Sequence, residues 1–144
     1  MPVIVVGADT RIGLEVIHGL LEPGREVRAF VSDPEVASGL RAAGVKVALG
    51  DVSDDSHIQG AATNCFSAVL VTEAARDDRE RSFAATPDEV LAGWAKAVSA
   101  SAVKRTIWIG DEAPDVATPE RAIVSPSMED LVERVVSLDN AAKI

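Results

Sequence analysis

The fold is decided by the segment Val3–Gly13, whose sequence is VIVVGADTRIG. Its first four residues form a continuous apolar run, which is typical of a strand buried on both faces of a parallel sheet. Gly7 follows directly and predicts a tight turn, and Gly13 stands where the next helix must pack close to the sheet. Backbone N–H groups at the start of that helix would face outward, where they could hold an anion such as a pyrophosphate.

Short apolar runs alternate with amphipathic segments along the rest of the chain. We expect strands at Val3–Val6, Glu26–Val31, Val45–Leu49, Ser67–Thr72 and Arg105–Ile109, and a short sixth at Arg121–Ser125. We expect helices at Arg11–Glu22, from Ser32 or Asp33 to Gly44, from Ser53 or Asp54 past Ile58, from Thr86 past Val98, and from Ser125-Pro126 to Leu138. This alternation predicts an α/β fold, a doubly wound parallel sheet of Rossmann type with strand order 3-2-1-4-5. Residues 1–144 show no internal boundary and are expected to form a single domain.

Composition narrows the class of function. Apolar residues make up 47% of the chain and aromatic residues only 3%, so aliphatic side chains and alanine must build the core. The net charge of −9 repels phosphate backbones, so we expect no nucleic-acid partner. One cysteine and two histidines give neither an internal disulfide nor metal-site spacing. No apolar run reaches the roughly 18 residues of a membrane helix, and no basic leader precedes the first strand. We therefore expect a cytoplasmic protein with no membrane partner.

Four stretches carry a family resemblance. They are Gly7–Gly13 (GADTRIG), Glu26–Val31 (EVRAFV), Gly50–Val52 (GDV) and Ala102–Ile109 (AVKRTIWI). In this order they resemble the atypical short-chain dehydrogenase/reductase superfamily, and most of all its nitrogen-metabolite-repression-regulator-like NAD(P)-binding proteins. The resemblance runs from Val3 to about Ile109. It implies a Rossmann domain that binds NAD or NADP, in a truncated and degenerate form.

The resemblance also implies a set of cofactor-binding positions. They are Gly7, Ala8, Asp9, Thr10, Arg11, Ile12, Gly13, Ser32, Asp33, Asp51, Val52 and Thr72. Asp51 matches the family residue that approaches the adenine, although an acid after a strand can also serve only the turn. Asp33 follows Gly13 by about twenty residues, a spacing compatible with ribose binding, but a helix cap before Pro34 is the stronger interpretation.

Several positions depart from the family pattern. Thr10 replaces a third glycine, and its bulk would hold a diphosphate away from the backbone, although its hydroxyl could donate to a phosphate. Asp9 would oppose a bound diphosphate by its charge, unless it caps the helix instead. Ser32 stands where NADP-preferring relatives often carry arginine, and Val31 stands where NAD-preferring relatives carry an acid. Glu73, after the fourth strand, adds negative charge at the edge of the cleft.

The catalytic residues of the superfamily are missing from these 144 residues. Its proton donor is a tyrosine paired with a lysine, and the chain contains no tyrosine. Gly110-Asp111 replaces the serine that usually follows the fifth strand. We therefore expect a non-catalytic protein with weak or lost dinucleotide binding and a regulatory or interaction role. Two alternatives stay open: an NAD(P)H-dependent oxidoreductase that lacks the usual tyrosine, and a purely structural interaction domain.

Other candidate groups have simpler interpretations. His18 and His57 are expected at the surface or its boundary, and Cys65 in the interior. Acids after the fifth strand could line a pocket or bind a cation, although a solvated loop is the simpler expectation; they are Asp111, Glu112 and Asp115. The charged stretch Glu73–Arg81 is expected to be a solvated loop or a mobile turn. Apolar helix faces suggest a homodimer; they contain Val90, Leu91, Trp94 and Val98, and Leu131, Val132, Val135 and Val136.

Overall fold

The computed structural model describes residues 1–144 as one six-stranded, fully parallel sheet in the order β3-β2-β1-β4-β5-β6. The strands are β1 (Val3–Val6), β2 (Val27–Val31), β3 (Lys46–Leu49), β4 (Ser67–Val71), β5 (Arg105–Ile109) and β6 (Glu120–Val124). The α-helices are α1 (Arg11–Leu20), α2 (Pro34–Ala42), α3 (Asp55–Ala61), α4 (Pro87–Ala100) and α5 (Leu131–Asn140), with a 3-10 turn, η1, at Thr72–Ala75. The predicted fold class, strand order and sixth strand are all confirmed.

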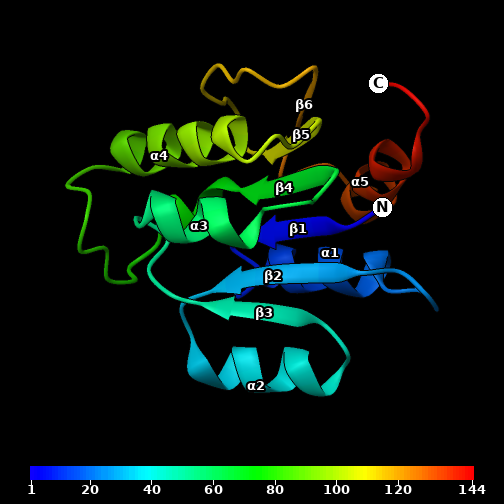
Figure 1. Ribbon diagram of the computed structural model, residues 1–144, viewed down its shortest axis with the longest axis horizontal. Coiled ribbons are helices and arrows are strands. Elements are labelled where there is room, and N and C mark those ends of the chain that lie inside the picture. Colours follow the sequence, from blue (N-terminus) through cyan, green and yellow to red (C-terminus); the bar gives the residue numbers. More distant parts are fainter.

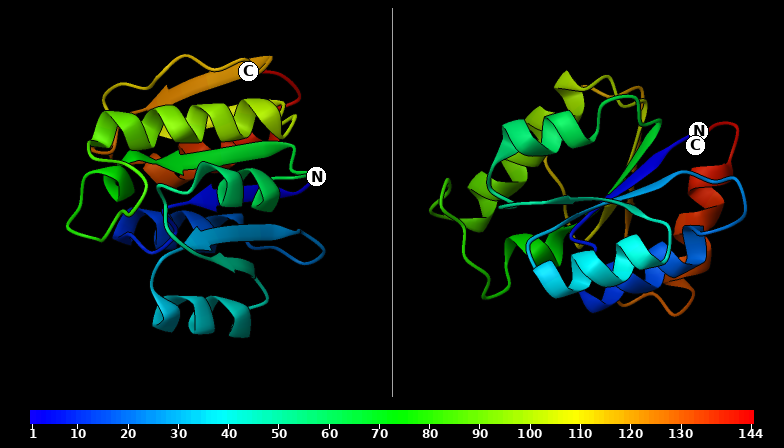
Figure 2. Two further views of the ribbon diagram at one scale, coloured as in Figure 1. Left: turned by 60° about the vertical axis from the view of Figure 1, so that its left-hand side comes forward. Right: turned by 60° about the horizontal axis from the view of Figure 1, so that its bottom comes forward.

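Helices cover both faces of the sheet (Figures 1 and 2). Successive residues of β1 point to opposite faces, so Val3 and Val5 join the core under α1, α2 and α5. Ile4 and Val6 join the core under α3 and α4. Burial on both faces explains why apolar residues fill β1, the last four residues of β4 and the last three of β5 without alternation.

Because β1 is a central strand, the glycine turn lies in the middle of the edge formed by the carboxyl ends of the strands. Val5 pairs with Ala29 of β2 on one side and with Val69 of β4 on the other. The chain crosses from one half of the sheet to the other at this strand, and ligands of open α/β sheets bind at such a switch point, beyond the carboxyl ends of the strands.

The last helix begins later than the sequence pattern predicts. Residues 125–130 form a turn, in which the Met128 amide donates to the Ser125 carbonyl at 3.2 Å, and α5 starts at Leu131. Ser125 and Ser127 bond to each other through their hydroxyls at 2.9 Å. These local bonds compete with helix formation, so Pro126 belongs to a turn and not to a first helical turn.

The apolar helix faces that suggested a dimer pack against the chain's own core, although Val132 and Val136 are only partly buried there. Trp94 and Val135 are both fully buried, in the two core clusters on opposite faces of the sheet. Self-association stays a prediction without that motive. No helix is long and apolar enough to cross a membrane.

Candidate functional site

The turn after β1 requires glycine at both of its ends. Gly7 has φ +84°, which is the left-handed region, and an added Cβ would lie 2.9 Å from Cβ of Ala74. A Cβ at Gly13 would strike the Gly7 carbonyl and lie 2.7 Å from Cα of Ala8. Helix α1 can therefore approach the turn only because residue 13 has no side chain.

Thr10 is the N-cap of α1. Its hydroxyl donates to the Gly7 carbonyl at 2.7 Å and accepts from the Gly13 amide at 2.9 Å, and the residue is buried. The alternative that Asp9 caps this helix is therefore wrong. The Thr10 hydroxyl is committed inside the turn, so it is no free donor for a phosphate.

Two amides at the start of α1 remain unpaired. The N–H groups of Arg11 and Ile12 make no hydrogen bond within the chain, as expected for the first turn of a helix. They carry the positive end of the helix dipole and form a site for an anion.

A cavity of about 610 Å³ opens beside this helix start. Ile12 lines one side, and the carboxyl ends of β4 and β5 line the other, with Val71, Thr72, Ile109 and Gly110. The remaining lining residues are polar or belong to the loops: Glu73, Arg76, Asp77, Asp111, Glu112 and Pro126. The Thr72 hydroxyl donates to the Ile109 carbonyl at 2.8 Å, so Thr72, one of the cofactor-binding positions that the sequence predicted, holds these two strand ends together.

Asp9 turns toward the end of β2. Its Oδ2 accepts from the amides of Ser32 at 2.8 Å and Asp33 at 3.2 Å, and its Oδ1 lies 2.8 Å from Arg79 Nη1. Only 4% of the Asp9 side chain is exposed. The expected repulsion between Asp9 and a diphosphate loses its basis, because a guanidinium and two amides already compensate this carboxylate.

Arg79 belongs to a buried ion network. Its Nη2 lies 2.8 Å from Asp77, which also pairs with Arg81 at 2.7 Å. Burial opposes the charge on Arg79, yet its hydrogen bonds to Asp77 and Asp9 raise the pKa of the guanidinium. Burial likewise opposes the charge of Asp77, but the Arg79 bond lowers the pKa of that carboxyl. The sequence predicted a solvated loop or mobile turn over Glu73–Arg81, and this is wrong for part of the stretch: Thr72–Ala75 is a 3-10 turn, and the side chains of Arg79 and Arg81 are largely buried. The other charged residues of the stretch are exposed, apart from the half-buried Asp77.

The same loop is fixed to the end of β3. The Asp51 carboxylate accepts from the Ser53 amide at 2.8 Å and, through its other oxygen, from the Ser82 amide at 2.8 Å. The Phe83 amide donates to the Ser53 hydroxyl at 3.0 Å. Burial raises the pKa of Asp51, but these serine bonds outweigh it and the pKa is lowered. In Figure 1 the loop lies beyond the arrowheads of the strands, between η1 and α4.

The remaining sequence-predicted positions serve the framework around this edge. Asp33 caps α2 by accepting from the Glu35 amide at 2.9 Å, which confirms the cap interpretation. Val52 is fully buried, and its carbonyl accepts from Trp94 Nε1 at 2.7 Å. Ala8 is also fully buried.

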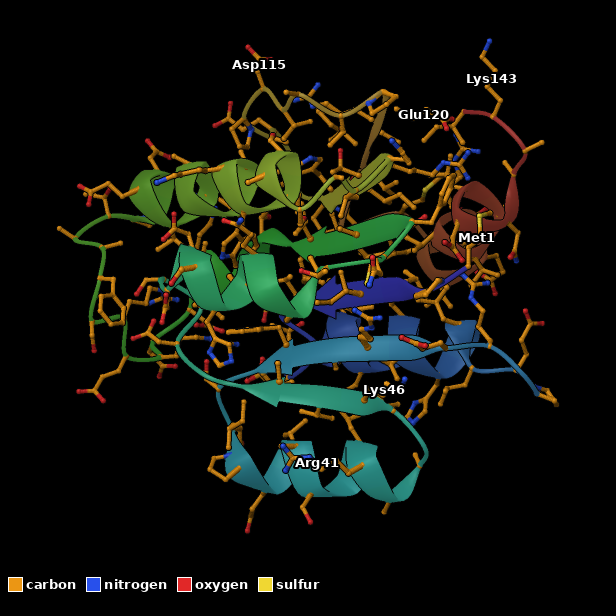
Figure 3. The ribbon with its side chains drawn as sticks, viewed as in Figure 1. Met1, Arg41, Lys46, Asp115, Glu120 and Lys143 are labelled. Atoms are coloured by element: carbon orange, nitrogen blue, oxygen red, sulfur yellow. The ribbon has the colours of Figure 1, made fainter.

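The histidines, the cysteine and the acids after β5 do not come together as a catalytic or metal-binding group. His18 and His57 are exposed, and His57 packs edge-on against Phe30 with ring centroids 4.9 Å apart. Cys65 is buried, and burial raises the pKa of its thiol to about 11. Asp111 and Glu112 line the cavity, whereas Asp115 is exposed and points outward from the β5–β6 loop (Figure 3). No group of three metal-ligating side chains occurs.

The two halves of a dinucleotide would meet different surroundings at this site. The free amides of Arg11 and Ile12 suit its pyrophosphate, and the adjoining cavity suits a planar ring and ribose. At the ends of β2 and β3, where the adenosine half of such ligands binds, Asp9 and Asp51 are engaged by the loop through Arg79 and Ser82. The site residues therefore fit the cofactor, and its adenosine half must share this edge with the loop. Sequence reasoning missed Arg79; its signal was the alternation of arginine and acid in Arg76–Arg81.

Solved structures share this fold. Triphenylmethane reductase of Citrobacter sp., complexed with NADP(H), is 24% identical with a TM-score of 0.63, over 76% of this chain and 37% of that one. An Escherichia coli NADPH-dependent quinone oxidoreductase, complexed with NADPH, is 22% identical with a TM-score of 0.61, over 75% of this chain and 36% of that one. The chain thus spans little more than a third of the length of these two proteins. At such identities the likeness shows the fold alone.

A comparison with curated proteins gave no match. A comparison with protein families matched residues 7–134, from the glycine turn into α5, to a family described as NAD(P)H-binding. The match includes the turn, the free amides and every strand end that lines the cavity. The chain belongs to this NAD(P)H-binding family.

Proposed function

We propose that the chain holds NAD(P)H with its pyrophosphate on the amides of Arg11 and Ile12 and its nicotinamide in the 610 Å³ cavity. The observation that carries this proposal is that Ile12 belongs to both features: its amide is free, and the residue lines the cavity. The ends of β4 and β5 complete the other wall. Thr72 and Gly110 keep that wall close, since a Cβ at residue 110 would strike the Thr72 hydroxyl.

We further propose that the chain is a non-catalytic member of the atypical short-chain dehydrogenase/reductase superfamily, similar to its nitrogen-metabolite-repression-regulator-like branch. In an oxidoreductase a bound reduced nicotinamide would supply a hydride, and the reaction would also need a proton donor beside it. The ionisable side chains around the cavity are four carboxylates and Arg76, and these 144 residues include no tyrosine to donate a proton. Such a domain would report the presence of a nucleotide to a partner through its surface.

A second candidate function is an NAD(P)H-dependent reductase. The size of the cavity favours it, because 610 Å³ lies within the range of small-molecule sites, roughly 300–1,000 Å³. In that case the proton would come from water or from the substrate.

One matched pair of variants tests the binding proposal. Arg11 is the first residue of α1, a position that proline accepts, and Thr10 is already extended with ψ 161° as a residue before proline should be. Arg11→Pro therefore removes one proposed phosphate-binding amide and leaves the helix intact. Arg11→Ala removes the same exposed side chain but keeps the amide. Titration calorimetry should show NADH binding to the wild type and Arg11→Ala, and binding at least about tenfold weaker to Arg11→Pro.

The outcomes separate the hypotheses. Equal binding by both variants, with equal melting temperatures, would remove the helix start from the site. The absorbance of reduced nicotinamide distinguishes the non-catalytic domain from the reductase, because it falls when NADH or NADPH is oxidised. We expect no oxidation of either with aldehydes, ketones or quinones. Steady turnover with any of them would establish the second candidate.

A further inference from the structure

In Rossmann sites, residues at the end of β2 contact the 2′ position of the adenine ribose and so distinguish NAD(H) from NADP(H). An acid there bonds the 2′-hydroxyl of NAD(H), and a nearby arginine accommodates the 2′-phosphate of NADP(H). This chain has Ser32 and Asp33 at that place, and Asp33 is occupied as the cap of α2. Neither residue supplies a cation. The groups that meet at this point come instead from the glycine turn and from the β4–α4 loop.

The two backbone amides at the end of β2 and the Arg79 guanidinium beside them already donate to a carboxylate of the chain. The amides of Ser32 and Asp33 donate to Asp9, at 2.8 Å and 3.2 Å. Arg79 Nη1 donates to Asp9 at 2.8 Å and reaches the Ser32 hydroxyl at 3.4 Å. An incoming 2′-phosphate would need these same donors, so the buried Asp9 carboxylate must be displaced before it can bind.

The charges around this point also disfavour a further anion. The two arginines of the network, Arg79 and Arg81, are matched by the two acids Asp9 and Asp77. Asp33 and Asp51 lie beside the network and pair with no cation; they accept only from amide and hydroxyl groups. A phosphate monoester would add up to two more negative charges to a region that is already negative. A 2′-hydroxyl adds none.

We propose that the Asp9–Arg79 pair makes this site select NAD(H) against NADP(H), by placing the chain's own carboxylate where a 2′-phosphate would have to bind. The inference rests on the proposed dinucleotide site and names its ligand. Arg79 lies where its guanidinium could bind a 2′-phosphate, but it is already paired with the Asp9 carboxylate. Asp9 is thus a specificity-determining residue, in a segment otherwise concerned with the pyrophosphate.

The test is the ratio of the dissociation constants of NADPH and NADH, measured by calorimetry at matched, low salt. For the wild type we expect NADPH to bind at least about tenfold more weakly than NADH, which is about 1.4 kcal/mol. In Asp9→Asn the amide oxygen can still accept from Ser32, while the charge of Arg79 is released. This ratio should then fall at least about tenfold, with NADPH gaining affinity.

Two further variants keep the test decisive. Asp77→Asn withdraws the second acid from Arg79 without touching the glycine turn, and it should shift the ratio in the same direction, by a smaller factor. Asp115→Asn makes the same change in net charge on the outward-pointing loop and should leave the ratio unchanged (Figure 3). Circular dichroism melting of each variant shows whether it is folded, and Asp77→Asn replaces Asp9→Asn if the latter is not.

Wild-type binding of NADPH as tight as that of NADH would overturn the selectivity and leave the dinucleotide site standing. An unchanged ratio in folded Asp9→Asn and Asp77→Asn would also overturn it. Failure of the wild type to bind either dinucleotide would instead remove the proposed function, and the inference with it. Competition by 5′-ADP and 2′,5′-ADP provides the same comparison for the adenosine half alone, with 5′-ADP expected to compete better.

Discussion

Arg79 Nη1 lies 2.8 Å from Asp9 Oδ1, although 70 positions of the chain separate these residues. The contact joins the glycine turn to the loop between η1 and α4. The same loop also bonds to the end of β3: the Ser82 amide donates to Asp51, and the Phe83 amide donates to Ser53. One loop thus ties together the carboxyl ends of the first three strands.

Loss of the Arg79 guanidinium should destabilise the fold. In Arg79→Gln the buried Asp9 and Asp77 carboxylates lose their shared cation, whereas Asp9 keeps its two amides. We expect a loss of about 3 kcal/mol in the free energy of unfolding, the low end for a broken buried ion pair. Urea titration measures it. Arg11→Gln is the control, because the Arg11 side chain is 90% exposed and its pair with Glu15 should contribute under about 0.5 kcal/mol. Equal losses in both variants would contradict the buried network.

Acid should weaken the loop through Asp51 and Asp77. The pKa of each is lowered in the folded protein, from an ordinary 3.8. The stability that they contribute is therefore complete above the unfolded pKa and is lost as the pH falls through the folded pKa. Between about pH 5 and about pH 3 the urea midpoint should fall, and the double variant Asp51→Asn/Asp77→Asn should fall less steeply. A variant with the same slope as the wild type would show that other groups govern the acid transition.

The two tryptophans provide a matched comparison of a hydrogen bond. Both are fully buried, but Trp94 Nε1 donates to the Val52 carbonyl at 2.7 Å, and Trp108 Nε1 is buried without a partner. Replacement by phenylalanine removes a similar volume at each site. Trp94→Phe should cost about 1–2 kcal/mol more than Trp108→Phe, because it leaves the Val52 carbonyl unpaired. Chemical denaturation followed by circular dichroism decides this; a larger loss in Trp108→Phe would contradict it.

Cys65 should be inert in the native protein. It is 4% exposed, and burial raises the pKa of the thiol to about 11, so almost no thiolate is present near pH 8. Ellman's reagent should react with it only as fast as the protein opens, and at once in denaturant. Immediate stoichiometric reaction under native conditions would contradict this burial.

The sequence predicted correctly the elements whose form depends on neighbouring residues alone. The apolar runs in β1, β4 and β5 indicate strands covered on both faces, and Gly7 and Gly13 lie where an added Cβ would collide with the turn or the residues beside it. The start of α5 was misplaced because Ser125-Pro126 suits both a helix start and a turn. In the structure the turn forms, and the hydroxyls of Ser125 and Ser127 bond to each other at 2.9 Å.

The site was predictable only in its phosphate half. The amides of Arg11 and Ile12 follow from the strand-turn-helix pattern alone. The role of Asp9 depends on Arg79, and the role of Asp51 depends on Ser82, contacts between segments far apart in the chain. A run of charged residues such as Arg76–Arg81 usually indicates a solvated surface, and nothing local shows that its arginines are buried against acids from other loops.

The central claim is that NAD(P)H binds at the start of α1 beside the cavity. Amide chemical shifts of ¹⁵N-labelled protein, recorded during a titration with NADH, test it most directly. We predict that the largest changes occur at the amides of Arg11 and Ile12 and at Gly110 across the cavity, and that they saturate together. Saturating changes confined to other parts of the sheet, or no change at millimolar NADH, would contradict the account.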